Sequence, residues 1–170
     1  NIEGISNPKC FTLTTGHQLN VFTGPVFMIY KILHVIRLSE ELKKEYPDCQ
    51  FVPVFWMATE DHDYEEISSV ELFGRELKWD TSQSGAVGRF ETAGLEALKD
   101  EIRTSFSSVD TSQIDAFLSA YSGETLTEAT FSLIHELFSE YGLLCIDGDH
   151  ALLKTQFVPI VQKELSEEFS

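Results

Sequence analysis

Five carboxylates surround a single histidine in residues 60–66. The carboxylates are Glu60, Asp61, Asp63, Glu65 and Glu66, and the histidine is His62. Carboxylates at this spacing repel one another, which raises the pKa of some of them and allows one to act as a base near neutral pH. The same charge attracts an ammonium group, and His62 offers a second base or a donor held in one tautomer by a neighbouring carboxylate. The alternative is a solvated acidic helix start, and we expect Glu65 and Glu66 to be surface residues.

A second polar segment, Thr15-Gly16-His17-Gln18, is followed by Thr23-Gly24 and Pro25 at the start of a predicted helix. A helix start offers unpaired N–H groups and a partial positive charge, which suit a phosphate or a carboxylate. The alternative is that these residues only begin the helix, because neither of the common glycine-rich nucleotide-binding patterns is present.

A third polar segment begins at Asp147, after an apolar run. The carboxylates and histidines of the three segments could converge as metal ligands, but their spacing matches no known ligand pattern, and we expect no metal. Lys31 lies in the apolar half of the predicted helix. It either extends its amine to solvent or reaches an anion in the site.

The elements that position these segments follow from the apolar patterns. Residues 11–15 and 51–58 are predicted strands around a helix over 25–45, which gives a right-handed parallel βαβ unit. A hairpin is predicted over 70–79, with its turn at Gly74-Arg75. Further elements are predicted at 95–106, 113–121, 126–141 and 151–169 (helices) and at 143–147 (strand).

The fold class that follows is α/β, a Rossmann-like parallel sheet core with an inserted hairpin and helical segment. In such sheets ligands bind beyond the carboxyl ends of the strands, where the three polar segments lie. We divide the chain into residues 1–80 (the βαβ part and hairpin), 81–125 (a flexible and helical insertion) and 126–170 (the return to the core). The chain opens on Asn1 and closes in an acidic helical pattern, so we expect a piece of a longer protein.

Composition limits the class of partner. The net charge is −16 over 170 residues, and such a surface repels nucleic acid and anionic membranes. No run is apolar enough to span a bilayer, and no N-terminal signal pattern is present. Cys10, Cys49 and Cys145 form no C-x-x-C pair, so we expect reduced structural cysteines in a cytoplasmic protein, with a catalytic thiol as the alternative.

Several motifs together resemble the BshC family, the cysteine-adding enzymes of bacillithiol synthesis. The most specific is the stretch from Val52 to Asp63 (VPVFWMATEDHD). Supporting matches are Thr15-Gly16-His17-Gln18, Phe22 to Pro25, Tyr30-Lys31, Gly85 to Arg89, and the run from Tyr141 to Asp147 with Leu153-Lys154 after it. Many family members carry glutamine where this chain has His17. A hydrogen-bonding role at that position is compatible with either residue.

The resemblance implies a ligase that joins the carboxyl group of cysteine to the amine of glucosaminyl malate. It implies small-molecule substrates, activation by ATP or another nucleotide, and a longer protein whose C-terminal coiled coil could make a homo-oligomer. His62, Asp63, Asp61 and Glu60 become the candidate catalytic residues. The candidate substrate-binding residues are Thr15, Gly16, His17, Gln18, Thr23, Gly24, Lys31 and Asp147.

Two other readings stay open at this stage. One is a metal-dependent hydrolase that uses the Asp/His cluster, and the other is a non-catalytic nucleotide-binding module. We expect this chain on its own to be inactive.

Overall fold

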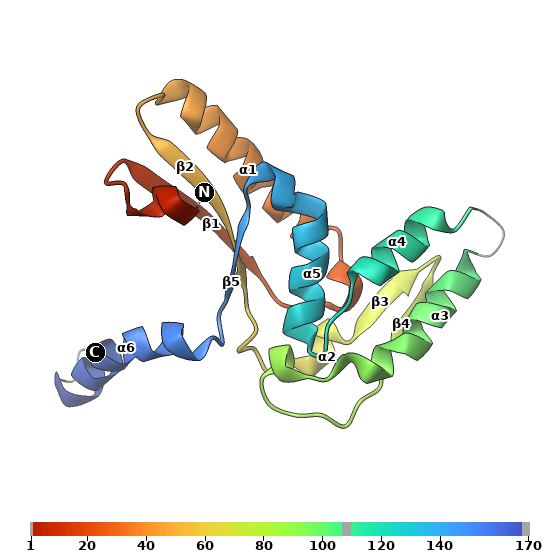
Figure 1. The fold of residues 1–170 in the computed structure, drawn as a ribbon. Helices are drawn as coiled ribbons and strands as arrows, with labels where there is room; N and C mark the ends of the chain where they lie inside the picture. Colours follow the sequence, from red (N-terminus) through yellow and green to blue (C-terminus); the bar gives the residue numbers. More distant parts are fainter. Residues whose placement is uncertain (1, 107–109, 168–170) are drawn as a thin grey trace.

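The computed structural model describes residues 2–106 and 110–167. Its centre is a parallel sheet of three strands in the order β1-β2-β5 (Figure 1). The strands are β1 (Cys10–His17), β2 (Gln50–Met57) and β5 (Leu144–Asp147). The predicted α/β class and the parallel pairing around a helix are confirmed.

The β1-α1-β2 unit forms because short apolar runs in its sequence are separated by glycine and proline residues, which end strands and helices. Helix α1 (Phe27–Glu45) buries one face, on which Met28, Ile32 and Ile36 lie. Lys43 and Lys44 occupy its last turn, where cations stabilise the negative end of the helix dipole. Pro53 lies in β2 opposite Leu13, but outside the pairing with β5, which starts at Val54. The missing proline N–H therefore falls where β2 has only one neighbouring strand.

Both crossover connections step in the same direction across the sheet, from β1 to β2 and from β2 to β5. Right-handed crossovers in one direction place their helices on one face. Helices α1 and α5 (Leu126–Phe138) accordingly lie on the same side of the strands in Figure 1. Helix α6 (Ala151–Glu167) leads away on the other side, and apolar side chains such as Leu152 and Leu165 are exposed along it.

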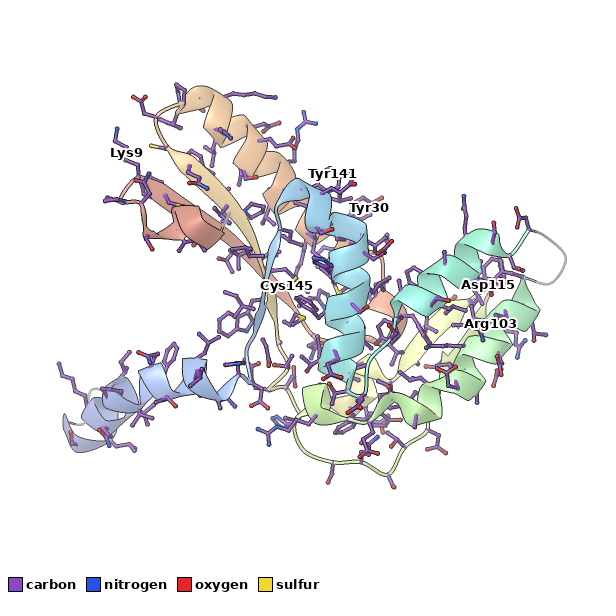
Figure 2. The ribbon with its side chains drawn as sticks, viewed as in Figure 1. Lys9, Tyr30, Arg103, Asp115, Tyr141 and Cys145 are labelled. Carbon is purple, nitrogen blue, oxygen red and sulfur yellow. The ribbon has the colours of Figure 1, made fainter. Side chains whose placement is uncertain are left out.

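In its described residues, the insertion between β2 and α5 contains a two-stranded antiparallel hairpin and three α-helices. Its elements are α2 (Tyr64–Ile67), β3 (Ser69–Leu72), β4 (Arg75–Lys78), α3 (Leu95–Ser105) and α4 (Ser112–Ala120). The hairpin turn lies at Phe73-Gly74, where both residues have positive φ, so the predicted turn at Gly74-Arg75 was one residue too late. Arg103 on α3 pairs with Asp115 on α4 at 3.2 Å, which ties these helices together (Figure 2).

Short 3-10 helices complete the chain. They are η1 (Ile2–Ser6), η2 (Val21–Thr23), η3 (Val87–Arg89), η4 (Thr92–Gly94) and η5 (Ser139–Tyr141). The predicted helix over 126–141 thus ends as an α-helix at Phe138. Gly142 follows in the left-handed conformation, as a C-terminal glycine does. Residues 168–169, which the prediction placed in the last helix, lie outside the described residues.

One continuous apolar core joins the sheet side to the insertion. Phe22, just before α1, contacts Tyr121 after α4, with ring centroids 4.9 Å apart. Trp79 and Leu118 belong to the same buried cluster as Phe55 of β2. The division into residues 1–80, 81–125 and 126–170 stays a prediction. Among the helices of the described ranges, none is both long and apolar enough to cross a membrane.

Candidate active site

The carboxyl ends of the three strands meet at one edge of the sheet, as the parallel order requires. His17 pairs with Met57, and Met57 pairs with Asp147. The chain continues these pairings beyond the strands, since Ala58 N donates to His17 O at 3.1 Å and Gly148 N donates to Met57 O at 3.0 Å. The three polar segments therefore start side by side.

At the end of β1, Gly16 packs closely against β2. A Cβ on Gly16 would lie 3.3 Å from the Trp56 carbonyl oxygen, which leaves little room for a side chain. The amine of Lys31 on α1 reaches back to this point and donates to Gly16 O at 3.1 Å. Lys31 also lies 5.0 Å from the centre of the Phe27 ring. The amine of Lys31 thus contacts a backbone carbonyl at the end of β1, and its role in binding a substrate stays a prediction.

The His17 imidazole is partly buried beside the same helix. Its Nδ1 lies 3.2 Å from Gln18 O, and its ring meets Phe27 edge-on. Burial is the main cause that lowers the pKa of His17, so the ring is neutral at neutral pH. A neutral imidazole acts as a hydrogen-bonding group, which glutamine at this position could replace.

The turn before α1 is left-handed over three successive residues, Phe22, Thr23 and Gly24. A Cβ on Gly24 would lie 2.4 Å from Asn20 Cβ, so the turn requires glycine there. Thr23 is buried, with 8% of its surface exposed. No side chain caps the start of α1, and its first turn carries no acidic residue. The helix start therefore presents a positive end without a neutralising carboxylate.

Gln18 joins the first polar segment to the second. Its Nε2 donates to Asp61 Oδ2 at 2.9 Å and to Glu66 Oε2 at 2.8 Å. Asp61 Oδ1 also accepts from the backbone N–H groups of His62 at 2.6 Å and Asp63 at 3.0 Å. Glu66 is exposed, as expected of a surface residue, and its carboxylate also takes part in this contact.

The hydrogen bonds around Asp61 also decide its charge. The bond from the backbone N–H of Asp63 comes first, followed by the bond from Gln18, and together they hold the pKa of Asp61 below 3.8. We expected crowding to raise the pKa of some of these carboxylates, and Asp61 is not one of them. Donated hydrogen bonds stabilise the ionised form more than neighbouring charges destabilise it. Asp61 is thus a permanent anion at neutral pH rather than a base.

The remaining acidic residues of the second segment either cap a helix or face solvent. Asp63 caps the short helix α2 by accepting from Glu66 N at 3.4 Å. Glu65 is exposed and pairs with Lys78 at 2.8 Å, as expected of a surface residue. His62 is exposed next to Asp61, to which its backbone is bonded.

The second and third polar segments are joined by the buried Thr59. Its hydroxyl donates to Asp147 Oδ1 in a short hydrogen bond and accepts from Asp149 N at 2.8 Å. Glu60 lies against Gly148, because a Cβ on Gly148 would fall 2.2 Å from a Glu60 carboxylate oxygen. The structure therefore gathers the ends of all three strands through side-chain contacts.

These contacts bring most of the predicted site residues together. The residues joined at the edge of the sheet are Gly16, His17, Gln18, Lys31, Glu60, Asp61 and Asp147. Thr15 lies one pair further back, opposite Phe55 in β2. The sequence placed Asp149 in the third polar segment as a helix cap, but it did not identify Asp149, Arg89 or Lys154 as site residues, although both cations contact the Asp149 carboxylate. Arg89 lies 60 positions from Asp149, so no local pattern could have joined them.

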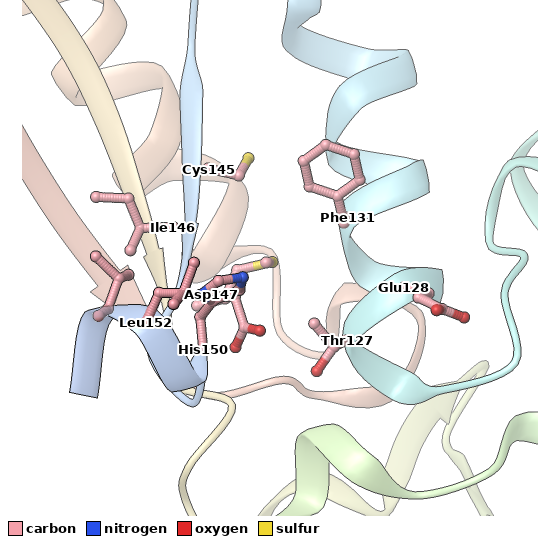
Figure 3. A pocket seen from close by; sticks show the side chains of 10 residues that line it. Thr127, Glu128, Phe131, Cys145, Ile146, Asp147, His150 and Leu152 are labelled. Carbon is pink, nitrogen blue, oxygen red and sulfur yellow. The ribbon is translucent and has the colours of Figure 1, made fainter. Parts of the chain in front are cut away.

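A cavity of about 600 Å³ opens beside the third strand end, between α5 and the start of α6 (Figure 3). Its walls are mainly apolar, and Phe131, Cys145 and Ile146 lie among them. Asp147 and His150 bring polar groups to the same space (Figure 3). A pocket with apolar walls and a few polar groups at one end can hold a small organic ligand.

In the described part of the chain, no three His, Cys, Asp or Glu side chains form a group that could hold a metal ion. The metal-dependent hydrolase alternative therefore finds no support in the arrangement of the cluster. The three cysteines are free, and burial raises the pKa of Cys145 to about 11.

Comparison with known proteins gives a consistent result. The family model for the bacillithiol biosynthesis BshC N-terminal Rossmann-like domain matches residues 1–170. A protein of Cytophaga hutchinsonii is 46% identical over 99% of this chain and 31% of its own length, and one of Flavobacterium psychrophilum is 45% identical over 97% and 32%. Both carry the name "Putative cysteine ligase BshC". The chain spans about a third of the length of these relatives, and it belongs to the BshC family as an N-terminal Rossmann-like domain.

Proposed function

We propose that the protein containing this chain is a ligase that joins the carboxyl group of cysteine to the amine of glucosaminyl malate. The amide so formed is bacillithiol. The proposal is supported by the family and by the name cysteine ligase that its relatives carry. The structural observation that carries it is the Gln18–Asp61 contact, which joins two polar loops into one charged site at the carboxyl edge of the sheet.

Asp61 binds the ammonium group of cysteine in this proposal. Its carboxylate is held ionised by neutral donors, the backbone N–H of Asp63 and the amide of Gln18. Neutral donors leave its full negative charge in place, so a cationic ligand gains the whole attraction. Glu66, which shares the Gln18 amide, adds a second negative charge nearby.

A different group must accept a proton during amide formation. The amine of glucosaminyl malate is protonated in solution and attacks only as the free base, so a base has to take that proton. Among the candidate catalytic residues we assign this role to His62 or Glu60, because Asp63 caps α2 and the lowered pKa of Asp61 makes it a weaker base. The exposure of both side chains leaves them accessible to a substrate in the site.

The carboxyl group of cysteine needs activation, because a carboxylate is a poor electrophile. We propose that ATP or another nucleotide supplies it, which the Rossmann-like fold allows. The uncapped start of α1, near Thr23 and Gly24, would hold phosphate or carboxylate groups. His17 and Lys31 stand at the same end and would add a donor and a positive charge.

The cellular location and the partners of the enzyme are also part of the proposal. We propose a cytoplasmic protein with free thiols that acts on small molecules and binds neither nucleic acid nor membrane. Homo-oligomer formation would involve regions of the relatives that this chain does not cover.

A product assay on the full-length protein tests the proposal. Purified protein is incubated with cysteine and glucosaminyl malate, with and without ATP, and the products are analysed by mass spectrometry. We expect the condensed thiol, formed only with the nucleotide. Absence of the product with folded protein, under every nucleotide tested, would contradict the proposed reaction.

A further inference from the structure

Asp149, just after the third strand, holds two cations that come from distant parts of the chain. Arg89 Nε donates to Asp149 Oδ2 at 2.5 Å, and Lys154 Nζ donates to Oδ1. The side chain of Asp149 is only 9% exposed, whereas those of Arg89 and Lys154 are 71% and 52% exposed. A partly buried carboxylate thus fixes two charged groups that face solvent.

The backbone places this cluster at the edge where the strands end. Asp149 N donates to Thr59 Oγ1 at 2.8 Å and to Asp147 Oδ1 at 3.0 Å. The short helix η3 that carries Arg89 is anchored to the second polar segment, because Val87 N donates to Asp61 O at 2.7 Å and Gly88 N to Thr59 O at 3.0 Å. Both cations are therefore attached to the same loops that build the candidate active site.

Most of the hydrogen-bonding capacity of these cations is unused. A guanidinium has five N–H donors and an ammonium has three. Within the described residues, only Nε of Arg89 and one bond from Lys154 are engaged, both with Asp149. Both cations are largely exposed, so an incoming anion can reach their remaining N–H groups while the bonds to Asp149 stay in place.

The net negative charge of the chain affects where an anion can bind. At a net charge of −16, an anionic substrate meets a repulsive surface almost everywhere. Arg89 and Lys154 place two positive charges here, which balance the negative charges of Asp149 and of the neighbouring Asp147, so this part of the surface is not net negative. Two such cations beside an acidic site give an anion a defined place to bind.

We propose that Arg89 and Lys154, with Asp149 as the positioning residue, bind the anionic group of a substrate in the ligase reaction. This rests on the proposed function and adds a binding site to it. The anion is either the pair of carboxylates of the malate group or the phosphate chain of the nucleotide. The adjacent cavity leaves room for the uncharged remainder, since Thr127, which lines it, donates to Gly88 O next to Arg89.

The test uses the full-length protein and single substitutions that remove one charge at a time. Arg89→Gln and Lys154→Gln are compared with Arg37→Gln, which removes an arginine from an exposed ion pair with Glu41 on α1. Arg89→Lys keeps the charge and changes the geometry. KM values for glucosaminyl malate, ATP and cysteine are measured, and malate and ATP alone are titrated calorimetrically as binding probes.

We expect Arg89→Gln and Lys154→Gln to raise the KM for one anionic substrate about 10- to 100-fold, the effect of losing a hydrogen bond to a charged group. The KM for cysteine and all constants of Arg37→Gln should stay within about twofold. A rise for glucosaminyl malate, with weaker malate binding, identifies the carboxylates. A rise for ATP identifies the phosphates.

Two results would contradict the proposal that Arg89 and Lys154 bind an anion. The first is that both anionic KM values stay unchanged in the two Gln variants. The second is that kcat falls with unchanged KM values and a lower Tm, which assigns the ion pairs a structural role that Arg89→Lys should then restore.

The direct titrations keep this proposal separate from the proposed function. If the wild type forms product and the variants bind the probes normally, the anion site fails and the ligase stands. If the wild type forms no product but binds malate or ATP, and the Gln variants lose that binding, the anion site stands and the ligase reaction fails.

Discussion

Asp61 and Asp149 are both held ionised, yet the structure does so by opposite means. The pKa of Asp61 is lowered first by a backbone N–H, that of Asp63, and then by the Gln18 amide. The pKa of Asp149 is lowered first by its bond with the Arg89 guanidinium, with Lys154 contributing as well. Neutral donors leave the charge of Asp61 uncompensated, whereas two cations more than compensate the charge of Asp149.

The difference gives the two sides of the site opposite signs. The side built on β1 and β2 presents negative charge through Asp61 and Glu66. The side built on β5 presents positive charge through Arg89 and Lys154. Opposite charges on the two sides suit a reaction between a cationic amino group and an anionic partner. Each substrate is attracted to one side and repelled by the other.

Removing the charge of Asp61 should produce the largest change. We expect Asp61→Asn to lower kcat/KM for cysteine about 100-fold, equivalent to about 2.7 kcal/mol, because the ammonium loses its charged partner. Asparagine can still accept the backbone N–H bonds, so the loop should keep its shape. The measurement is steady-state kinetics of the full-length protein.

Glu65→Gln is the matched control, since Glu65 is exposed and pairs only with Lys78 in the described contacts. Its kcat/KM should change less than about twofold. If Asp61→Asn also falls within that range, the negative side of the site has no part in binding cysteine.

Gly88→Ala should disturb the positive side through packing. A Cβ on Gly88 would lie 2.6 Å from Thr59 Cβ, 2.8 Å from Thr59 O and 2.5 Å from Thr127 Oγ1. Overpacking of this kind costs about 1–3 kcal/mol, so the free energy of unfolding should fall by that amount. The shift of η3 should also raise the KM for the anionic substrate more than that for cysteine.

Gly74→Ala provides the comparison in the hairpin turn. Its Cβ would meet no atom within 4 Å, and only the positive φ of 74° opposes it. We expect a loss of about 1 kcal/mol from backbone strain and unchanged KM values. Equal kinetic effects from the two glycines would show that packing at Gly88 does not position Arg89.

The two aspartates should also respond differently to salt at low pH. Both have a folded pKa below the ordinary 3.8, so each stabilises the fold above the unfolded pKa, and that contribution is lost as pH falls through the folded pKa. Urea unfolding between about pH 3 and 6 should show a stability that declines toward low pH, and Asp61→Asn or Asp149→Asn should flatten part of the decline.

Added salt of about 0.5 M should reduce the Asp149 share and leave the Asp61 share, because salt screens the exposed cations but not hydrogen bonds from neutral donors. A similar salt response at both positions would remove the distinction between the two sides.

The sequence was sufficient for the framework of the site. The apolar runs of β1 and β2, with Gly16 and Pro25 between them, predicted the βαβ unit, since hydrophobic periodicity and chain breakers are local signals. Parallel pairing then implied that the segments after His17, Met57 and Asp147 meet at one edge, which the register confirms.

The distribution of charge in the site could not be predicted from the sequence. The low pKa of Asp61 depends on hydrogen bonds from the Asp63 backbone, the Gln18 amide and the His62 backbone, and their direction is set by the fold of the loop. The positive side depends on Arg89 reaching Asp149 across 60 positions, through hydrogen bonds between η3 and the second loop. Neither property is encoded in a short pattern.

The smallest effect is expected at Cys145, which lies on the edge strand β5 and lines the cavity beside α5 (Figures 2 and 3). Burial raises the pKa of its thiol to about 11, so only a small fraction is thiolate at neutral pH. The thiolate is the reactive form, and an inert thiol beside the site argues against a catalytic role.

We therefore expect Cys145→Ala to keep kcat/KM within about threefold and to lose only about 1–2 kcal/mol of stability from the small cavity it leaves. Iodoacetamide labelling of the native protein at about pH 8 should be slower at Cys145 than for the same residue in urea. Fast native labelling accompanied by loss of activity would instead place a reactive thiol between the negative and positive sides and return the catalytic alternative to consideration.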